Sequence, residues 1–218
     1  DVIFHFGEFS RIYQSFLQMN KCIQSNTIGT NAVFDFCLKN KIKVIYSATS
    51  ASLGNKGEDQ NLSPYAFTKA KNIEFLENLK KWFNFKYDVI FFYNVYGPRQ
   101  ISNGKMATVI GIFEDLYNKR KALTVVKPGN QSRRFTHISD TVNGILLVSL
   151  KDTCDDYQIT SGVSYSINDI ARMFSNNIIY LPPRNGERSI STGSNEKLVK
   201  LGWKPKYDLK EYISNIVV

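Results

Sequence analysis

Cysteine is scarce in this chain and is spread along its whole length. The three cysteines, Cys22, Cys37 and Cys154, lie far apart, and there are only two histidines. Neither a Cys-x-x-Cys pair nor a cluster of cysteine with histidine occurs, so we expect no disulfide framework and no metal site. Unpaired thiols are typical of a reducing compartment, which predicts a cytoplasmic protein.

Long hydrophobic runs are also missing. The longest uninterrupted apolar and aromatic run covers residues 89–93, whereas a helix that crosses a bilayer needs about 20 apolar residues. The start of the chain shows no pattern of a signal peptide. The sequence therefore predicts no association with a membrane.

Acidic residues are too few to balance the basic ones, and the net charge is +9. A basic chain can bind nucleic acid or a phosphorylated small molecule. The lysines and arginines are dispersed, however, and the densest groups, at residues 80–81 and 119–121, fall near predicted helix ends. Because a nucleic-acid surface needs a basic face with interleaved aromatic residues, we expect no nucleic-acid partner.

A glycine-rich phosphate-binding turn is the most informative absence. None of the 13 glycines forms a Gly-x-Gly-x-x-Gly or a Gly-x-x-x-x-Gly-Lys motif, although a dinucleotide site needs such a turn after its first strand. The chain opens directly on a strand-like run, residues 2–6, and closes inside a helical pattern. We therefore expect the sequence to lack the first strands of a longer domain.

What is present is a regular alternation of strand-like and helix-like segments. The 218 residues are 43% hydrophobic, which is enough for a substantial core. In the first part, strands are predicted at 2–6, 43–47 and 87–93, and helices at 11–39, with a break near Ser25 and Asn26, and at 64–83. Continuous hydrophobic strands separated by helices predict an α/β fold with a Rossmann-like, doubly wound parallel sheet.

The pattern changes after residue 98. There we predict helices at 105–119, 139–150, 166–174 and 209–217, and short strands at 123–127, 135–138, 156–160 and 178–181. This mixture indicates a smaller α/β substrate-binding lobe. We expect residues 1–98 to be the remainder of the Rossmann-like domain, and residues 99–218 to be mainly the lobe, with about 139–165 returning to the main sheet.

Two features carry candidate chemistry. Tyr65 and Lys69 are four residues apart at the head of a predicted helix and share one face of it. A nearby ammonium lowers the pKa of a tyrosine, and such a phenol can act as a general acid or base. Ser47 and Thr49 end the second predicted strand, where ligands bind in open α/β sheets. His5 and His137 are interpreted as packed structural side chains.

The order and spacing of these motifs resemble those of the extended short-chain dehydrogenase/reductase family, in particular its NAD-dependent nucleotide-sugar epimerases and dehydratases, such as UDP-glucose 4-epimerase. The similarity covers nearly the whole chain. The motifs that carry it lie at residues 1–7, 26–30 (Asn-Thr-Ile-Gly-Thr), 47–54, 65–69, 94–99, 129–140, 184–187 (Arg-Asn-Gly-Glu) and 201–205 (Leu-Gly-Trp-Lys-Pro).

The resemblance implies NAD as cofactor, a nucleotide-sugar substrate and a set of site residues. The implied catalytic residues are Tyr65, Lys69 and Thr49. The implied cofactor-binding residues are Gly7, Asn26, Ser47, Tyr65 and Lys69. The implied substrate-binding residues are Asn94, Arg133, Arg184 and Glu187. Arginines suit a diphosphate because their planar donors bind it in a bidentate manner.

Within the family, the residues after Thr49 favour epimerisation. Related dehydratases carry Asp-Glu there, and related decarboxylases carry a glutamate two positions on, whereas this chain has Ser50 and Ala51. Elimination of water needs such an acid and base. We therefore expect a C4 epimerase that works through a 4-keto sugar. The loop from Thr49 to Tyr65 is shorter than is usual in the family.

Other assignments remain open. The chain could be another NAD-dependent nucleotide-sugar enzyme, such as a 4-keto reductase or a dehydratase, or a truncated fragment that binds nucleotides without catalysis. Family members are often dimers that pair two helices, which correspond here to residues 11–39 and 64–83.

Overall fold

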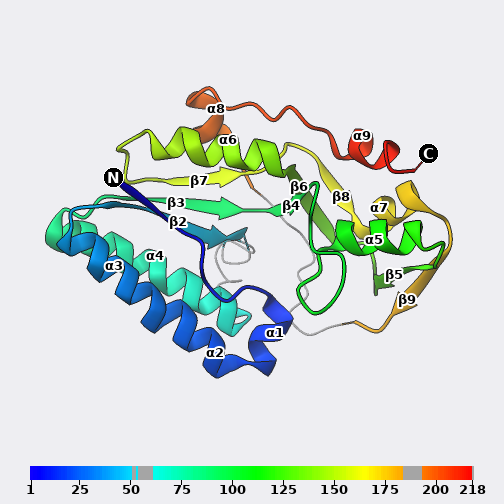
Figure 1. Ribbon diagram of the computed structural model, residues 1–218, viewed down its shortest axis with the longest axis horizontal. Coiled ribbons are helices and arrows are strands. Elements are labelled where there is room, and N and C mark those ends of the chain that lie inside the picture. Colours follow the sequence, from blue (N-terminus) through cyan, green and yellow to red (C-terminus); the bar gives the residue numbers. More distant parts are fainter. Residues whose placement is uncertain (51–52, 54–60, 184–192, 218) are drawn as a thin grey trace.

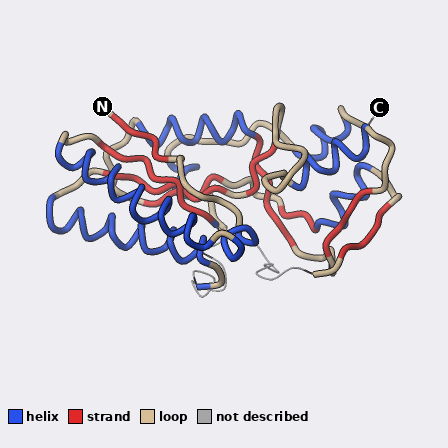
Figure 2. The backbone as a smooth tube through the Cα atoms, turned by 60° about the horizontal axis from the view of Figure 1, so that its bottom comes forward, coloured by secondary structure: helices blue, strands red, loops and turns tan. Residues whose placement is uncertain are grey.

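A computed structural model of the chain describes residues 1–50, 53, 61–183 and 193–217. Figure 1 shows a layered α/β body beside a smaller lobe, and Figure 2 shows the same division from a second direction. The body is built on a parallel sheet in the order β1-β2-β3-β7, made of β1 (Val2–His5), β2 (Lys43–Thr49), β3 (Tyr87–Phe92) and β7 (Asp156–Ile159).

Successive side chains of a strand point to opposite sides of the sheet. The apolar residues of these strands therefore form a hydrophobic core on each face. On one face, Val44, Tyr46, Val89 and Phe91 pack with buried residues of two helices, α3 (Thr30–Lys39) and α4 (Pro64–Phe83). On the other, Ile45 and Ile90 pack under two further helices, α6 (Ile138–Ser149) and α8 (Glu196–Lys200). Both faces are therefore covered, as the sequence predicts for this α/β class.

The lobe has two small sheets and a core of its own. In one, β6 (Ser132–His137) pairs in parallel with β4 (Asn94–Tyr96) and antiparallel with β8 (Ser164–Ser166); in the other, β5 (Leu123–Val126) pairs in parallel with β9 (Ile178–Leu181). Three helices pack around them: α5 (Val109–Asn118), α7 (Ile167–Phe174) and α9 (Leu209–Ser214). Residues 156–159 do return to the main sheet as β7, while the exact division at residue 98 stays a prediction.

The segment 11–39 differs in detail from its prediction. It forms α1 (Ile12–Leu17), α2 (Met19–Ile23) and α3, and a π-helical stretch, η1 (Gln24–Gly29), lies where a break is expected. The side chain of Asn26, within this stretch, binds the loop that follows β1. Its Oδ1 accepts from the backbone N–H of Phe9 at 2.7 Å and its Nδ2 donates to the Phe9 carbonyl at 3.1 Å. A π-turn thus anchors the loop that follows β1, and such turns often occur beside functional sites.

Other boundaries shift by a few residues. Helix α5 begins at Val109 rather than at residue 105, since Thr108 caps it by accepting from the N–H of Gly111 at 3.2 Å. Strand β6 begins three residues earlier than predicted, and three short elements, β4, β8 and α8, have no counterpart in the prediction. Short elements are missed because a few residues do not establish a period.

The Leu-Gly-Trp-Lys-Pro motif near the end of the chain packs against helix α6 of the body. Trp203 is buried, and its Nε1 donates to the carbonyl of Asp140 at 3.0 Å. A Cβ on Gly144 of α6 would lie 3.2 Å from that Nε1, so the glycine permits the indole to approach the helix closely. The Asp140 carboxylate then accepts from the N–H groups of Lys206 and Tyr207 at 3.0 and 3.1 Å.

In the part of the chain that is described, no helix combines the length and the apolar character needed to cross a membrane.

Candidate active site

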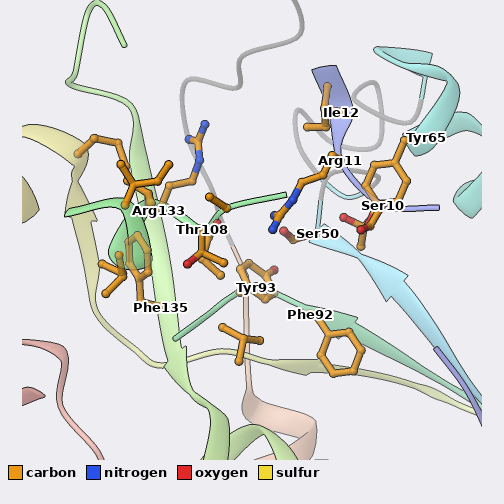
Figure 3. Close-up of a pocket in the computed structure, with 18 of the residues that line it drawn as sticks. Ser10, Arg11, Ile12, Ser50, Tyr65, Phe92, Tyr93, Thr108, Arg133 and Phe135 are labelled. Carbon is orange, nitrogen blue, oxygen red and sulfur yellow. The ribbon is translucent and has the colours of Figure 1, made fainter. Parts of the chain in front are cut away.

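A cavity of about 700 Å³ opens where the main sheet meets the lobe. One wall comes from the carboxyl ends of β1, β2 and β3 and from the start of α4; the other comes from α5, β5 and β6. Figure 3 shows Tyr65 and Ser10 on one side and Thr108, Arg133 and Phe135 on the other. This placement at the carboxyl edge of a parallel sheet is where open α/β proteins bind ligands.

Tyr65 reaches the cavity because of how α4 begins. Ser63 caps the helix by accepting from the N–H of Ala66 at 3.1 Å, and Pro64 takes the first helical position, which suits its fixed backbone angle. Tyr65 then falls in the first turn and lines the cavity together with Thr49 from the end of β2. A hydrogen bond from Thr49 acts to lower the pKa of Tyr65, but burial raises it more.

Lys69 lies one turn further along α4 and is almost completely buried. Its Nζ forms an ion pair with Glu8, donates to the Ser47 carbonyl and to Ser47 Oγ at 3.1 Å, and lies 4.8 Å from the centre of the Tyr46 ring. Burial lowers the pKa of Lys69, and the neighbouring Glu8 carboxylate opposes that shift. The expected Tyr65–Lys69 spacing and the Ser47–Thr49 strand end are therefore brought together in one cavity.

Glu8 changes the electrostatics that the sequence predicts. The expectation is that Lys69 lowers the pKa of Tyr65, whereas in the structure that pKa is raised, first by burial and then by the charge of Glu8. The negative charge of Glu8 offsets that of Lys69 because the two groups form a buried ion pair. The cation that acts to lower the pKa of Tyr65 is instead Arg11.

The Glu8 carboxylate is held by four donors. It accepts from Lys69, from Thr30 Oγ1 at 2.7 Å, from Tyr46 Oη at 3.1 Å and from Asn72 Nδ2 at 3.0 Å. The sequence reasoning missed this residue and its neighbours Ser10 and Arg11. The signal was available, because all three follow the carboxyl end of the first predicted strand, the same position that singles out Ser47 and Thr49.

Of the other residues implied for the cofactor, one lines the cavity, one borders an adjoining hollow and one lines neither. Ser47 lines the cavity. Gly7 is exposed and borders an adjoining hollow that shares Glu8 and Ser10 with it. Asn26 does not line either space; it is buried, and its side chain holds Phe9 and donates to Thr68 Oγ1 at 3.1 Å. Asn26 thus acts on the site through the loop after β1.

The residues implied for the substrate fall on the lobe side. Asn94 and Arg133 line the cavity; Asn94 Nδ2 donates to the Arg134 carbonyl at 3.0 Å, and Arg133 donates to the Ser132 carbonyl at 2.9 Å. Arg184 and Glu187 lie outside the described residues. His5 and His137 are packed side chains: His5 contacts Thr30 Oγ1 at 2.9 Å, and His137 stacks on Tyr207 with ring centres 4.1 Å apart.

Comparison with known proteins gives concordant matches. The model of the NAD dependent epimerase/dehydratase family matches residues 1–160. A Methanocaldococcus jannaschii protein, provisionally named a UDP-glucose 4-epimerase, is 29% identical over an alignment of 208 positions that covers 88% of this chain and 68% of that protein.

Solved structures match over almost the whole chain. UDP-glucose 4-epimerase from Thermotoga maritima, crystallised with UDP-glucose, has a TM-score of 0.92 at 24% identity and covers 99% of this chain and 75% of that one. UDP-N-acetylglucosamine 4-epimerase from Methanobrevibacter ruminantium, in complex with UDP-N-acetylmuramic acid, has a TM-score of 0.88 at 25% identity, over 100% of this chain and 75% of that one.

Proposed function

The chain belongs to the NAD dependent epimerase/dehydratase family, and on that premise we propose that it epimerises a nucleotide-diphosphate sugar at C4. NAD is the cofactor that this membership assigns. The observation that carries the proposal is the cavity in which Tyr65, Thr49 and Lys69 meet at the carboxyl edge of the parallel sheet, opposite Asn94 and Arg133.

The side chains on the body side fit a nicotinamide ribose. Tyr65 and Thr49 offer hydroxyl groups, and Lys69 offers an ammonium whose position is fixed by Ser47 and Glu8. Phe6 and Phe92, with ring centres 5.5 Å apart, add an apolar surface beside them. This donor set, next to two aromatic rings packed edge to face at 82°, suits a ligand that combines ribose hydroxyls with an apolar ring.

In the proposed mechanism, Tyr65 removes the proton of the sugar 4-hydroxyl and later returns one, while Thr49 shares the hydrogen bond to that oxygen. Bound NAD would supply the reversible hydride acceptor for C4, so the redox chemistry would belong to the cofactor. Lys69, whose charge Glu8 offsets, orients the ribose. The lobe residues Asn94 and Arg133 bind the remainder of the nucleotide sugar, since Arg suits a diphosphate.

The described part of the cavity offers no free carboxylate for the elimination of water, and this favours epimerisation over dehydration. Among its described lining residues, Glu8 is the only acidic one, and four donors already hold that carboxylate. A general acid or base must be free to approach the atom whose proton it transfers. Ser50 follows Thr49 and lines the cavity, but its side chain has no carboxyl group that could act as an acid or base.

Product identity tests this proposal. The chain is incubated with excess NAD and a panel of neutral and acidic UDP-sugars, and the products are identified by proton NMR. We expect the C4 epimer of at least one substrate. A 4-keto-6-deoxy sugar would instead identify a dehydratase, and net consumption of NADH with a 4-keto sugar would identify a reductase.

We further propose that the protein is a homodimer that pairs α3 with α4 of each copy. Both helices lie side by side on one face of the body (Figure 1). Phe36 of α3 is 52% exposed and Phe67 of α4 is 43% exposed. Large aromatic side chains left in water on adjacent helices are typical of an interface.

A further inference from the structure

Arg11 enters the cavity from the loop after β1. Its head group points into the cavity in Figure 3, on the same side as Ser10 and Tyr65. One terminal nitrogen, Nη2, donates to the Met106 carbonyl at the far side of the opening. The buried Nε has no hydrogen-bond partner, and no carboxylate of the described residues forms an ion pair with this guanidinium.

The backbone holds Arg11 in this position at a cost. Its φ is 101° and its ψ is 116°, a conformation that a residue with a side chain rarely adopts. Two anchors enforce it: Asn26 grips Phe9 on one side, and the Arg11 carbonyl accepts from the N–H of Ser15 at 3.1 Å on the other. Strain of this kind concentrates at functional sites, where the surrounding structure maintains it.

Arg11 also stands out by its charge. The second cation beside Tyr65 is the buried Lys69, which Glu8 neutralises, whereas Arg11 is partly buried. The Arg11 guanidinium stays protonated at any physiological pH, although burial lowers its pKa. A partly buried cation with no anionic partner among the described residues is unfavourable, and a ligand that brings the anion removes that penalty.

Position decides which part of a ligand reaches Arg11. Arg133, the residue implied for the diphosphate, lies on β6 with Phe135 and Thr108 nearby, whereas Arg11 lies with Tyr65 and Ser10 across the cavity (Figure 3). If Tyr65 acts on the 4-hydroxyl, the group that meets Arg11 belongs to the sugar. The substituents on C3 and C5 adjoin that hydroxyl, and of these two the one on C5 becomes a carboxylate in an acidic hexose.

We propose that Arg11 is a specificity-determining residue that binds a carboxylate on the sugar, so that the substrate is an acidic nucleotide sugar. The inference rests on the proposed function and narrows its substrate class. Arg11 offers the carboxylate a charge-assisted hydrogen bond from Nε, and the planar guanidinium suits the two oxygens of a carboxylate.

Calorimetric titration of the chain with UDP-glucuronic acid and with UDP-glucose tests the inference. These two ligands share the nucleotide and differ in the carboxylate. We expect the wild type to bind UDP-glucuronic acid at least about tenfold more tightly, as one charge-assisted hydrogen bond allows. Arg11→Gln should remove this preference and leave the Kd of UDP-glucose unchanged, while Arg11→Lys should retain part of it.

Arg172→Gln is the matched control, because it removes the same charge from an exposed position on α7. It should leave both Kd values unchanged. Equal weakening of both ligands by Arg11→Gln would overturn the inference, since that result places Arg11 on the shared nucleotide diphosphate. Equal affinity of the wild type for both ligands would also overturn the inference. This result does not depend on whether the variants fold, because it uses only the wild-type protein. Binding of neither ligand would instead contradict the proposed function itself.

Discussion

At the scale of single residues, the site depends on how three charges are arranged around one phenol. Lys69 and Glu8 neutralise each other inside the body, and Arg11 contributes the remaining positive charge near Tyr65. The Tyr-x-x-x-Lys spacing predicts that Tyr65 and Lys69 share one helix face, and both line the cavity. It does not predict the pKa of Tyr65, because the counterion of the lysine comes from another segment of the chain.

The pH profile of turnover tests this arrangement. If Tyr65 is the base, kcat/KM rises with pH as the phenol loses its proton. Burial raises the pKa of Tyr65 and the charge of Glu8 raises it further, so Glu8→Gln should move the rising limb to lower pH. Glu8→Asp, which keeps the charge, is the control and should leave the limb near its wild-type position. An identical limb in Glu8→Gln would show that this charge does not act on the base.

The backbone strain at Arg11 can be measured by comparing two substitutions that remove its side chain. Arg11→Ala and Arg11→Gly remove the same contacts, but only glycine adopts a φ of 101° without steric cost. Arg11→Gly should therefore unfold in urea with a free energy about 1–2 kcal/mol higher than Arg11→Ala. Equal stability of the two variants would mean that the loop after β1 relaxes when the arginine is lost.

At the scale of elements, the parallel sheet and its covering helices could be predicted, because continuous strands and long helices have clear periods. Strands β1, β2 and β3 and helix α4 agree closely with their predicted ranges. The π-turn at η1 and the short strands β4 and β8 could not be predicted. They depend on contacts such as the one between Asn26 and Phe9, which are seventeen residues apart in sequence.

The packing of Trp203 against α6 tests how the end of the chain closes the body. Trp203→Ala should lower the free energy of unfolding by about 3–5 kcal/mol, because it leaves a cavity beside Gly144 and the Asp140 carbonyl without its donor. Trp82→Ala is the matched control, since that indole is 61% exposed, and it should cost less than about 1 kcal/mol. Similar losses in urea denaturation would contradict the assigned role of Trp203.

At the scale of the whole molecule, the body supplies the proposed catalytic side chains and the lobe supplies the opposite wall of the cavity. The sequence located Tyr65, Lys69, Ser47, Thr49, Asn94 and Arg133, which all line this one space. It did not locate Glu8 or Arg11, although both lie on the loop after β1, at the carboxyl end of the first predicted strand. The folding of this loop against Asn26 brings both residues to the site.

The exposed aromatic surface of α3 and α4 predicts a dimer in solution. Light scattering should give twice the 24.9 kDa mass of the chain. Phe36→Glu should shift the protein to a monomer, because a buried unpaired carboxylate disfavours the interface. Leu150→Glu, at a site 82% exposed just after α6, should remain dimeric. A monomeric wild type would rule out this interface.

The most direct test of the account is the effect of Tyr65→Phe on C4 epimerisation and on binding of the same UDP-sugar. Tyr65 is the proposed acid and base, so its loss should reduce turnover by about 10²–10⁴-fold and change the Kd of the UDP-sugar little. Tyr180→Phe, which removes a hydroxyl on the lobe, provides the matched control and should keep full turnover. Undiminished epimerisation by Tyr65→Phe would contradict the mechanism.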